Sequence, residues 1–273
     1  MLIAMTHATT PNTAGAARLT LITGASRGVG LALAEALLER GERVLTLQRS
    51  PNALLARFGS QIEQWAVDLA EPAAVAARLE IWLRDTGAVG MQPAAVTLIN
   101  NAALLNELAP MSHAASADCG PAMRVGLEAP VLLSAAFLRA TRSWTCPRRL
   151  MQISSGLGRR AMAGSAVYCA VKAGLDHFSR AVALEEAEQS NGARCVSIAP
   201  GIIDTDMQRQ LRGANAQQFP AQAQFQAMKD EGRLDSPQGC AAKLLAYLDR
   251  TDFGEQPVAD VRDPPPVAAE PSA

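Results

Sequence analysis

The stretch LTLITGASRGVG, Leu19–Gly30, decides how the rest of the chain is interpreted. It opens with five apolar or β-branched residues, continues with glycines at 24, 28 and 30, and leads into the helical pattern LALAEALLER at 31–40. Glycines between a strand and a helix permit a tight turn and let a pyrophosphate approach backbone N–H groups at the positive helix end. The stretch therefore predicts a nucleotide-binding turn. Because the spacing is GxxxGxG rather than GxGxxG, a turn that serves packing alone is the alternative.

The alternation of strand and helix continues along the whole chain. Apolar runs predict seven strands, at 19–23, 43–48, 64–70, 94–100, 149–154, 193–199 and 256–261. Helical patterns lie at 31–40, 71–85, 121–141, 165–188 and 236–249, with two short ones within 206–231. Strands without polar alternation are buried on both faces, as in a parallel sheet covered by helices. The sequence predicts an α/β fold: a single doubly wound Rossmann-type domain with a parallel seven-stranded sheet and helices on both faces.

One domain accounts for this pattern. A chain of 273 residues could hold one large α/β domain or two small ones, and no interior linker or repeat divides it. We predict that the domain spans 18–262. Residues 1–17 are small and polar and predict a flexible N-terminal extension, whereas the proline-rich residues 263–273 predict a disordered tail.

The composition excludes several classes of protein. Hydrophobic residues make up 49% of the chain and the formal net charge is -1, with no long basic run. These values argue against a nucleic-acid or membrane surface, and we expect no apolar run of membrane-spanning length. Five cysteines without CxxC or Cys/His spacing predict no metal site and a reducing compartment. Residues 1–17 do not look like a signal peptide, so we expect a soluble, cytoplasmic protein.

Arginines near the glycine turn indicate which nucleotide it binds. A site for NAD places an acid about 20 residues beyond the glycines, where it holds the ribose 2′-OH. Here Gln48 and Arg49 stand in that place, and Arg27 lies inside the turn. Arginine binds phosphate as a planar fork, so the pattern favours NADP(H) over NAD(H). The alternative is that both arginines are solvated surface charges.

Tyr168 and Lys172 are notable for their spacing. The chain contains two tyrosines and three lysines, and VYCAVK at 167–172 places one of each four residues apart. Positions i and i+4 of a helix share a face, so both side chains are expected to point into the same cleft. An ordinary helix tyrosine beside a surface lysine is the alternative.

Several motifs, in order, resemble the short-chain dehydrogenase/reductase family from Leu19 to Asp260. They are TGASRGVG (23–30), VDLA (67–70), NNAA (100–103), ISS ending at Ser155, YCAVK (168–172) and PGIIDT (200–205). Ser155 lies thirteen residues before Tyr168, as in the family's catalytic pattern. Within the family, RVGLEAPVLLS (124–134) and the region 200–238 resemble the sepiapterin-reductase-like and benzil-reductase-like branch.

The resemblance implies a catalytic role for three residues. Tyr168 would give a proton to the carbonyl oxygen, while Ser155 would orient the carbonyl and stabilise the charge that develops on its oxygen. Lys172 would hydrogen-bond the nicotinamide ribose. Because a free phenol has a pKa of about 10, we also expect the neighbouring ammonium, together with oxidised nicotinamide, to lower the pKa of Tyr168 toward neutrality.

The resemblance also implies a set of cofactor contacts. Asp68 and Leu69 would meet the adenine, Asn100 and Ala102 the adenosine ribose, and Ile203 and Thr205 the carboxamide. The full expected set is Gly24, Ser26, Arg27, Gly28, Val29, Gly30, Gln48, Arg49, Asp68, Leu69, Asn100, Ala102, Tyr168, Lys172, Pro200, Gly201, Ile203 and Thr205. Asp68 and Thr205 could instead cap helices. We interpret His113 and His177 as structural.

Two positions depart from the family pattern. Ala103 replaces the last glycine of NNAG, and Gly126 replaces the asparagine of RVNLEAP. The family asparagine holds a water at a helix kink and links the lysine to bulk solvent. Glycine tolerates irregular helix geometry, so the kink could persist with a second water in the vacated space. Otherwise the proton relay is impaired, and restoring asparagine is expected to raise turnover modestly.

These observations predict an NADPH-dependent carbonyl reductase (EC 1.1.1 type) that transfers hydride to a ketone or diketone. The alternative is a catalytically weak or silent NADP-binding sensor or interaction protein, which only Gly126 favours. Segment 202–233 is expected to form a lid, and an apolar lid fits a hydrophobic or aromatic substrate. Its apolar residues are Met207, Leu211, Phe219, Phe225 and Met228, joined by Leu157 and Met162. The family implies a homodimer or homotetramer formed through the two long helices.

Overall fold

The computed structural model describes residues 17–88 and 92–264, and in them the predicted fold is confirmed. One parallel sheet has the order β3-β2-β1-β4-β5-β6-β7. Its strands are β1 (Leu19–Thr23), β2 (Arg43–Gln48), β3 (Ile62–Ala66), β4 (Val96–Asn100), β5 (Arg148–Ile153), β6 (Arg194–Ala199) and β7 (Val258–Asp260). The strand order reverses between β1 and β4, and doubly wound sheets bind ligands at the carboxyl ends of strands beside such a point.

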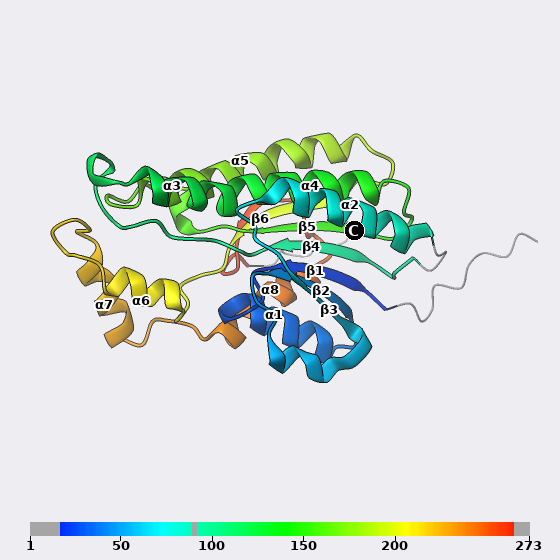
Figure 1. Cartoon of the computed structure of the whole chain (residues 1–273), viewed down its shortest axis with the longest axis horizontal. Helices are drawn as coiled ribbons and strands as arrows, with labels where there is room; N and C mark the ends of the chain where they lie inside the picture. Colours follow the sequence, from blue (N-terminus) through cyan, green and yellow to red (C-terminus); the bar gives the residue numbers. More distant parts are fainter. Residues whose placement is uncertain (1–16, 89–91, 265–273) are drawn as a thin grey trace, which may run out of the picture.

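Helices cover both faces of the sheet (Figure 1). On one face α1 (Gly28–Glu39) packs against α8 (Pro237–Leu248), and on the other α2 (Pro72–Ala88) packs against α4 (Ala129–Ala140). The second face also carries α3 (Ser116–Met123), a π-helical segment η3 (Arg124–Glu128) and α5 (Ala166–Ala187). Two short helices, α6 (Asp206–Arg212) and α7 (Gln222–Asp230), project beyond the sheet on one side (Figure 1).

Two apolar layers, one on each face, form the core. Leu21 and Ile22 are neighbours in β1 and both are fully buried, yet they belong to opposite layers. Leu37 of α1 packs in the layer of Ile22, and Phe137 of α4 packs in the layer of Leu21. Burial on both faces is the reason that the strands lack polar alternation.

The observed boundaries correct two predictions. β3 ends at Ala66 rather than at residue 70, because its neighbour β2 ends at Gln48 and the Asp68 carboxylate accepts a hydrogen bond from the Ala70 N–H at 2.9 Å, which forms a turn. The helix predicted at 121–141 begins at Ser116, ends at Ala140 and is interrupted by η3. Three 3-10 segments, Ala53–Gln61, Met111–His113 and Gly156–Gly158, had no predicted counterpart.

The continuous helical stretch Ser116–Ala140 also corrects the expectation about membrane spans. By length and composition alone it is apolar enough to cross a membrane, although half of its most apolar window is buried inside the protein. Leu133, Ala136 and Phe137 of α4 are fully buried in the apolar layer on that face of the sheet. Its apolar character is that of a helix that packs in a core.

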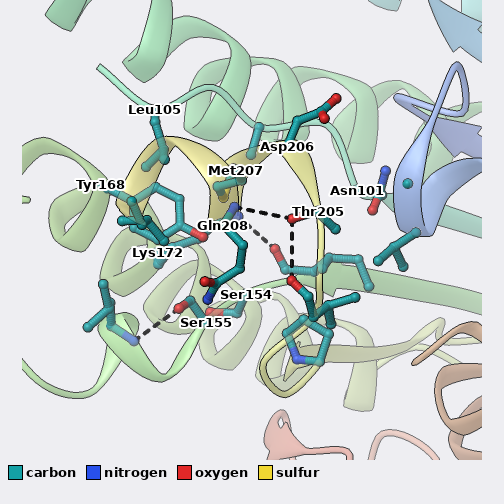
Figure 2. Close-up of a pocket in the computed structure, with 18 of the residues that line it drawn as sticks. Asn101, Leu105, Ser154, Ser155, Tyr168, Lys172, Thr205, Asp206, Met207 and Gln208 are labelled. Atoms are coloured by element: carbon teal, nitrogen blue, oxygen red, sulfur yellow. Dashed lines mark hydrogen bonds between the residues drawn. The ribbon is translucent and has the colours of Figure 1, made fainter. Parts of the chain in front are cut away.

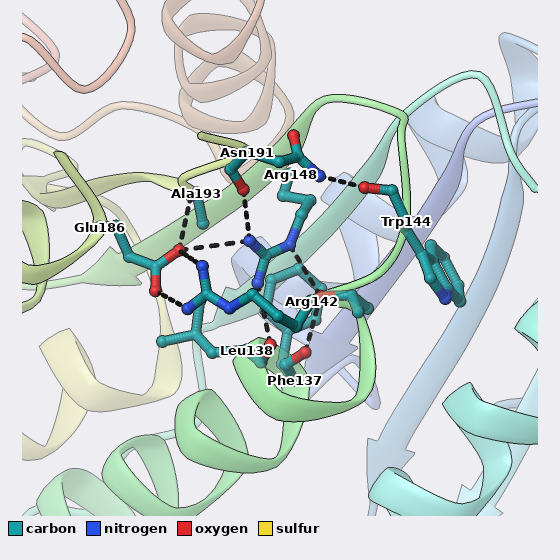
Figure 3. A network of polar contacts seen from close by, with 9 residues as sticks. Phe137, Leu138, Arg142, Trp144, Arg148, Glu186, Asn191 and Ala193 are labelled. Carbon is teal, nitrogen blue, oxygen red and sulfur yellow. Dashed lines mark hydrogen bonds and ion pairs between the residues drawn. The ribbon is translucent and has the colours of Figure 1, made fainter. Parts of the chain in front are cut away.

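A buried ion-pair network fixes the end of the sheet opposite the carboxyl ends of the strands (Figure 3). The Arg148 guanidinium, at the start of β5, is fully buried and donates to Glu186 Oε2 at 3.2 Å and to Thr141 Oγ1 at 3.0 Å. Arg142 pairs with the same Glu186 carboxylate. Removal of one member would leave a buried charge without its partner, at a cost of about 3–5 kcal/mol. The network therefore anchors the last turn of α5.

The expected terminal segments lie largely outside the described residues. Nothing in the structure bears on residues 1–16 or 265–273. The first two residues of the expected tail, Asp263 and Pro264, accept hydrogen bonds from Arg250 through their backbone oxygens. These two residues therefore remain attached to the domain.

Candidate active site

The glycine turn after β1 forms a close-packed cradle. Gly24 and Gly28 have φ values of 72° and 59°, a region that favours glycine. A Cβ on Gly30 would lie 2.2 Å from the Gly24 carbonyl oxygen and 2.5 Å from Asn101 Nδ2. Asn101 Nδ2 donates to the backbone oxygens of Thr23 at 3.0 Å and Gly24 at 3.1 Å. Only glycine fits position 30, and Asn101 holds the cradle in shape.

The carboxyl ends of β2 and β3 supply the next wall of the site. Gln48 is 3% exposed, and its Nε2 donates to Gln64 Oε1 at 3.0 Å, while its own Oε1 has no partner among residues 17–88 and 92–264. Arg49 follows it on the exposed rim and makes no ion pair with any residue that the structure describes. Arg27 is 71% exposed and pairs with Asp206 of α6 at 3.0 Å.

These features fit a dinucleotide. A buried amide oxygen without a partner is costly unless a ligand supplies the hydrogen bond, and a ribose hydroxyl is a donor of that kind. The glycine cradle lets a pyrophosphate reach backbone N–H groups at the start of α1. The residues that would hold the group are thus Gln48, the cradle and the arginines beside them.

All the predicted site residues except Asn100 line one cavity of about 1060 Å³. The Asn100 side chain is 2% exposed and donates to Ser134 Oγ at 3.3 Å, below the cavity floor. The structure therefore places Asn101, Ala102 and Ala103 at the cavity instead. The sequence signal for Asn101 was the second asparagine of NNAA, whose role depends on contacts with β1 that no local pattern reveals.

Ser155, Tyr168 and Lys172 converge on this cavity from two elements (Figure 2). Ser155 follows β5, and its Oγ accepts a hydrogen bond from the Leu157 N–H at 3.2 Å. Tyr168 and Lys172 come from the first two turns of α5, one turn apart on the same face. The Lys172 Nζ lies 5.5 Å from the centroid of the Tyr168 ring. The predicted juxtaposition of these three side chains is present.

The pKa of Tyr168 is set mainly by burial. Burial raises the pKa of the Tyr168 phenol to about 12, and a hydrogen bond with the Ser155 hydroxyl opposes the rise. The lowering expected from the sequence involves bound oxidised nicotinamide as well as Lys172, whose Nζ donates to the Ile153 carbonyl oxygen at 2.7 Å. A phenol of this pKa is protonated near neutrality and can act as a proton donor.

Lys172 is held in a partly ionic pocket. It is 2% exposed, and burial lowers its pKa to about 8 while the Asp176 carboxylate opposes that shift. Asp176 lies one turn further along α5 and accepts hydrogen bonds from Ser154 Oγ and Ser197 Oγ, both at 2.6 Å. Asp176 is not among the predicted site residues, although its i+4 spacing from Lys172 was a usable signal.

The segment after β6 covers the cavity with apolar side chains. Met207, Leu211, Phe225 and Met228 all line it, as predicted. Phe219 does not, because it is fully buried and stacks on Phe225 at a centroid distance of 5.7 Å. Leu157 and Met162 line the opposite side. Phe219 belongs to the small core that supports the cover rather than to its inner surface.

Thr205 combines the two roles that the sequence left open. It is the N-cap of α6, where its Oγ1 accepts a hydrogen bond from the Gln208 N–H at 3.4 Å, and it also lines the cavity. The Asp68 carboxylate similarly forms its own turn while lining the cavity. Neither capping interaction removes the residue from the site.

The environment of Gly126 leaves little room for the asparagine of the family pattern. Gly126 lies in the π-helical segment η3, so the irregular geometry expected at this position is present. A Cβ at this position would lie 2.6 Å from Cγ1 of Val171, which is 3% exposed on α5 between Tyr168 and Lys172. The branched valine occupies the space that a longer side chain would need.

Residues 18–216 match the sequence profile of the short chain dehydrogenases. The chain belongs to the short chain dehydrogenase family. It is 31% identical over 238 residues to the benzil reductase ((S)-benzoin forming) of Bacillus cereus, covering 86% of this chain and 96% of that protein. Within the family it therefore falls in the benzil-reductase-like branch.

Solved structures of short chain dehydrogenases share the fold. A member from Burkholderia vietnamiensis is 33% identical with a TM-score of 0.61, covering 91% of this chain and 98% of that one. A 4-hydroxyisoleucine dehydrogenase complexed with NADH superposes with a TM-score of 0.71 at 21% identity, covering 89% of this chain and 96% of that one. Short chain dehydrogenases are oxidoreductases that use nicotinamide cofactors, so this chain is an oxidoreductase of that family.

Proposed function

We propose that this short chain dehydrogenase is an NADPH-dependent carbonyl reductase that acts on a hydrophobic or aromatic ketone or diketone. The observation that carries the proposal is the convergence of Ser155, Tyr168 and Lys172 on the cavity that also contains the glycine cradle. The benzil reductase relative, which spans most of this chain, supports the reaction class.

Each of the three side chains has a distinct task in the proposed reaction. Bound reduced nicotinamide supplies hydride to the carbonyl carbon. The Tyr168 hydroxyl gives its proton to the carbonyl oxygen, which becomes the alcohol, and Ser155 Oγ donates a hydrogen bond to the same oxygen. Lys172, as the ammonium, stabilises the phenolate that Tyr168 becomes before it is reprotonated.

The preference for NADPH rests on the carboxyl end of β2. Gln48 and Arg49 offer no carboxylate there, and Arg49 is free to bind a 2′-phosphate. Asp206 competes for Arg27, so Arg49 is the better target for mutation. We expect Arg49→Asp to weaken NADPH binding by about 10- to 100-fold, as loss of charge-assisted hydrogen bonds implies, with little effect on NADH.

Titration of both cofactors against the wild type and the variant tests this preference. Arg43→Asp is the matched control, because Arg43 is exposed at the opposite end of the same strand. Equal affinity of the wild type for NADH and NADPH would contradict the preference.

The apolar cover supports a hydrophobic substrate. We expect oxidation of NADPH in the presence of aromatic 1,2-diketones, measured at saturating cofactor against a panel that includes small aliphatic ketones. The second candidate function is a catalytically silent NADP-binding protein, and the valine beside Gly126 is the observation that favours it. NADPH binding without turnover on any member of the panel would favour this second function.

Further proposals concern organisation and compartment. We propose residues 18–262 as the catalytic domain, with 202–233 as a substrate lid.

All five cysteines are free, which supports a reducing compartment such as the cytoplasm. Exposed Leu184 on α5 and Met123 on α3 support pairing of the long helices in a homodimer or homotetramer.

A further inference from the structure

Gln208 is a buried polar side chain of segment 202–233, and it lines the cavity together with the apolar side chains of that segment. It lies on α6, is only 6% exposed, and extends into the cavity that holds Tyr168 and Ser155 (Figure 2). The apolar side chains that line the same cavity include Leu105, Leu157, Met162, Met207, Leu211, Phe225 and Met228. A polar group in such a place needs a partner, since burial of an unmatched amide is costly.

The contacts of Gln208 determine which end of its amide is available. Its Oε1 accepts a hydrogen bond from Arg212 Nη1 at 3.4 Å. A guanidinium can only donate, so the oxygen must face Arg212 and the NH₂ group faces away from it. Arg212 is itself held by Asp204 at 3.4 Å, and its side chain is 13% exposed. The amide orientation is therefore fixed, and Nε2 is left as a donor in the cavity.

Several other polar groups around this part of the cavity are engaged or lie at its exposed rim. Ser154 Oγ donates to Asp176, and Arg159 also pairs with Asp176. Arg209 is exposed and pairs with Asp206. Among the residues that the structure describes, the inner donors left for a substrate include the hydroxyls of Ser155, Tyr168 and Ser165 and the amide of Gln208, and of these four only Gln208 belongs to segment 202–233.

We infer that Gln208 Nε2 binds the second oxygen of a vicinal dicarbonyl substrate, while Ser155 and Tyr168 hold the carbonyl that is reduced. This inference rests on the proposed reductase function and narrows its substrate class from ketones in general to 1,2-dicarbonyl compounds. A neutral amide whose oxygen is held by Arg212, itself paired with Asp204, suits a neutral carbonyl oxygen better than a carboxylate, which would favour a charged partner.

A pair of substrates that differ in one oxygen tests the inference. Benzil carries the second carbonyl, whereas deoxybenzoin has a methylene in its place and keeps both rings. The measured quantity is the ratio of kcat/KM for benzil to that for deoxybenzoin, because differences in intrinsic reactivity cancel when variants are compared. We expect Gln208→Leu to lower this ratio about tenfold, the effect of one lost neutral hydrogen bond.

Two further variants separate the hydrogen bond from its surroundings. Gln208→Glu keeps the shape and the contact with Arg212 but offers no donor, so its ratio is expected to fall at least as far, even if Gln208→Leu folds poorly. Gln226→Leu makes the same chemical change on α7, where Gln226 is exposed and its Nε2 donates a hydrogen bond to Asp230. This control variant is expected to keep the wild-type ratio. An unchanged ratio in both Gln208 variants, whether or not activity on the two substrates falls equally, would overturn the inference.

Binding distinguishes failure of this inference from failure of the proposed function. The Kd of benzil for the complex of the enzyme with NADP⁺ is measured for the wild type and for both Gln208 variants. If the wild type reduces neither substrate, the reductase proposal fails, and a benzil Kd about tenfold weaker in the variants still supports the role of Gln208. A benzil Kd that is the same in all three proteins, or no benzil binding at all, refutes it.

Discussion

The two long helical stretches on one face of the sheet are built in different ways. α5 runs without interruption through Ala166–Ala187 and places Tyr168, Lys172 and Asp176 on one face at successive turns. The neighbouring stretch Ser116–Ala140 contains Pro121 and widens into a π-helical turn at Arg124–Glu128. The two stretches pack together where η3 contacts α5.

The two stretches contribute to the site in different ways. The functional residues of α5 follow a regular i, i+4 spacing, so a local sequence pattern is enough to identify them. The irregular turn of the other stretch leaves Gly126 against Val171, which stands between the two catalytic positions of α5. The irregular helix therefore acts on the site through its fit to the regular one, and it also places Val125 in the cavity lining.

The largest effect is expected from removal of the phenol on the regular helix. Tyr168→Phe takes away the proton donor and should lower kcat by about 10³-fold, within the 10²- to 10⁴-fold range of general acid catalysis. NADPH affinity should change little, which fluorescence titration measures alongside steady-state kinetics. If Tyr168→Phe kept most of its turnover, Tyr168 would not be the proton donor.

The next effect tests the fit between the two helices. Gly126→Asn brings a side chain against Val171 and should lower the free energy of unfolding by about 1–3 kcal/mol, with no gain in turnover. The double variant with Val171→Ala should recover much of this loss, so the two single effects are not additive. Denaturant unfolding of the four proteins measures the coupling. Faster turnover in Gly126→Asn alone would restore the impaired-relay interpretation.

A smaller effect is expected on the pH profile. Lys172 has a pKa of about 8, and the negative Asp176 favours its protonated form. Reduction should therefore slow as the pH rises through about 8, where the ammonium is lost. Asp176→Asn removes the favourable charge, lowers the Lys172 pKa and should move this inflection to lower pH. Glu185→Gln is the control, because Glu185 is an exposed carboxylate on the same helix. If the inflection stayed at the same pH in Asp176→Asn, Asp176 would have no role in setting the pH dependence of the reaction.

The smallest effect on stability is expected on the outer face of α5. Leu184 is 73% exposed, so Leu184→Glu should change the free energy of unfolding of one chain by less than about 0.5 kcal/mol. If the long helices pair between subunits, light scattering should show a smaller assembly in this variant. Ile81→Glu on α2, where Ile81 is 60% exposed, is the control. The same assembly size in Leu184→Glu and the wild type would argue against the proposed pairing.

Local sequence patterns were sufficient for the framework of the protein. The bounds of β1 and β2 were predicted correctly, and α5 differs from its prediction by one residue at each end. The glycine turn and the spacing of Tyr168 and Lys172 also led to the correct family and cavity. These features depend on residues close together in the chain, where steric limits on the backbone and helical periodicity act directly.

Contacts between distant residues decided the rest. Phe219 and Phe225 read alike in the sequence, but only the folded cover shows that one supports and the other lines the cavity. The Tyr168 pKa depends on burial in the assembled domain, which outweighs the opposing hydrogen bond with Ser155. Likewise, the fit of Val171 to Gly126 and the orientation of Gln208 by Arg212 arise from packing and hydrogen bonding in the assembled domain. Sequence spacing determined which groups could act, and tertiary burial and contact determined which of them face the substrate.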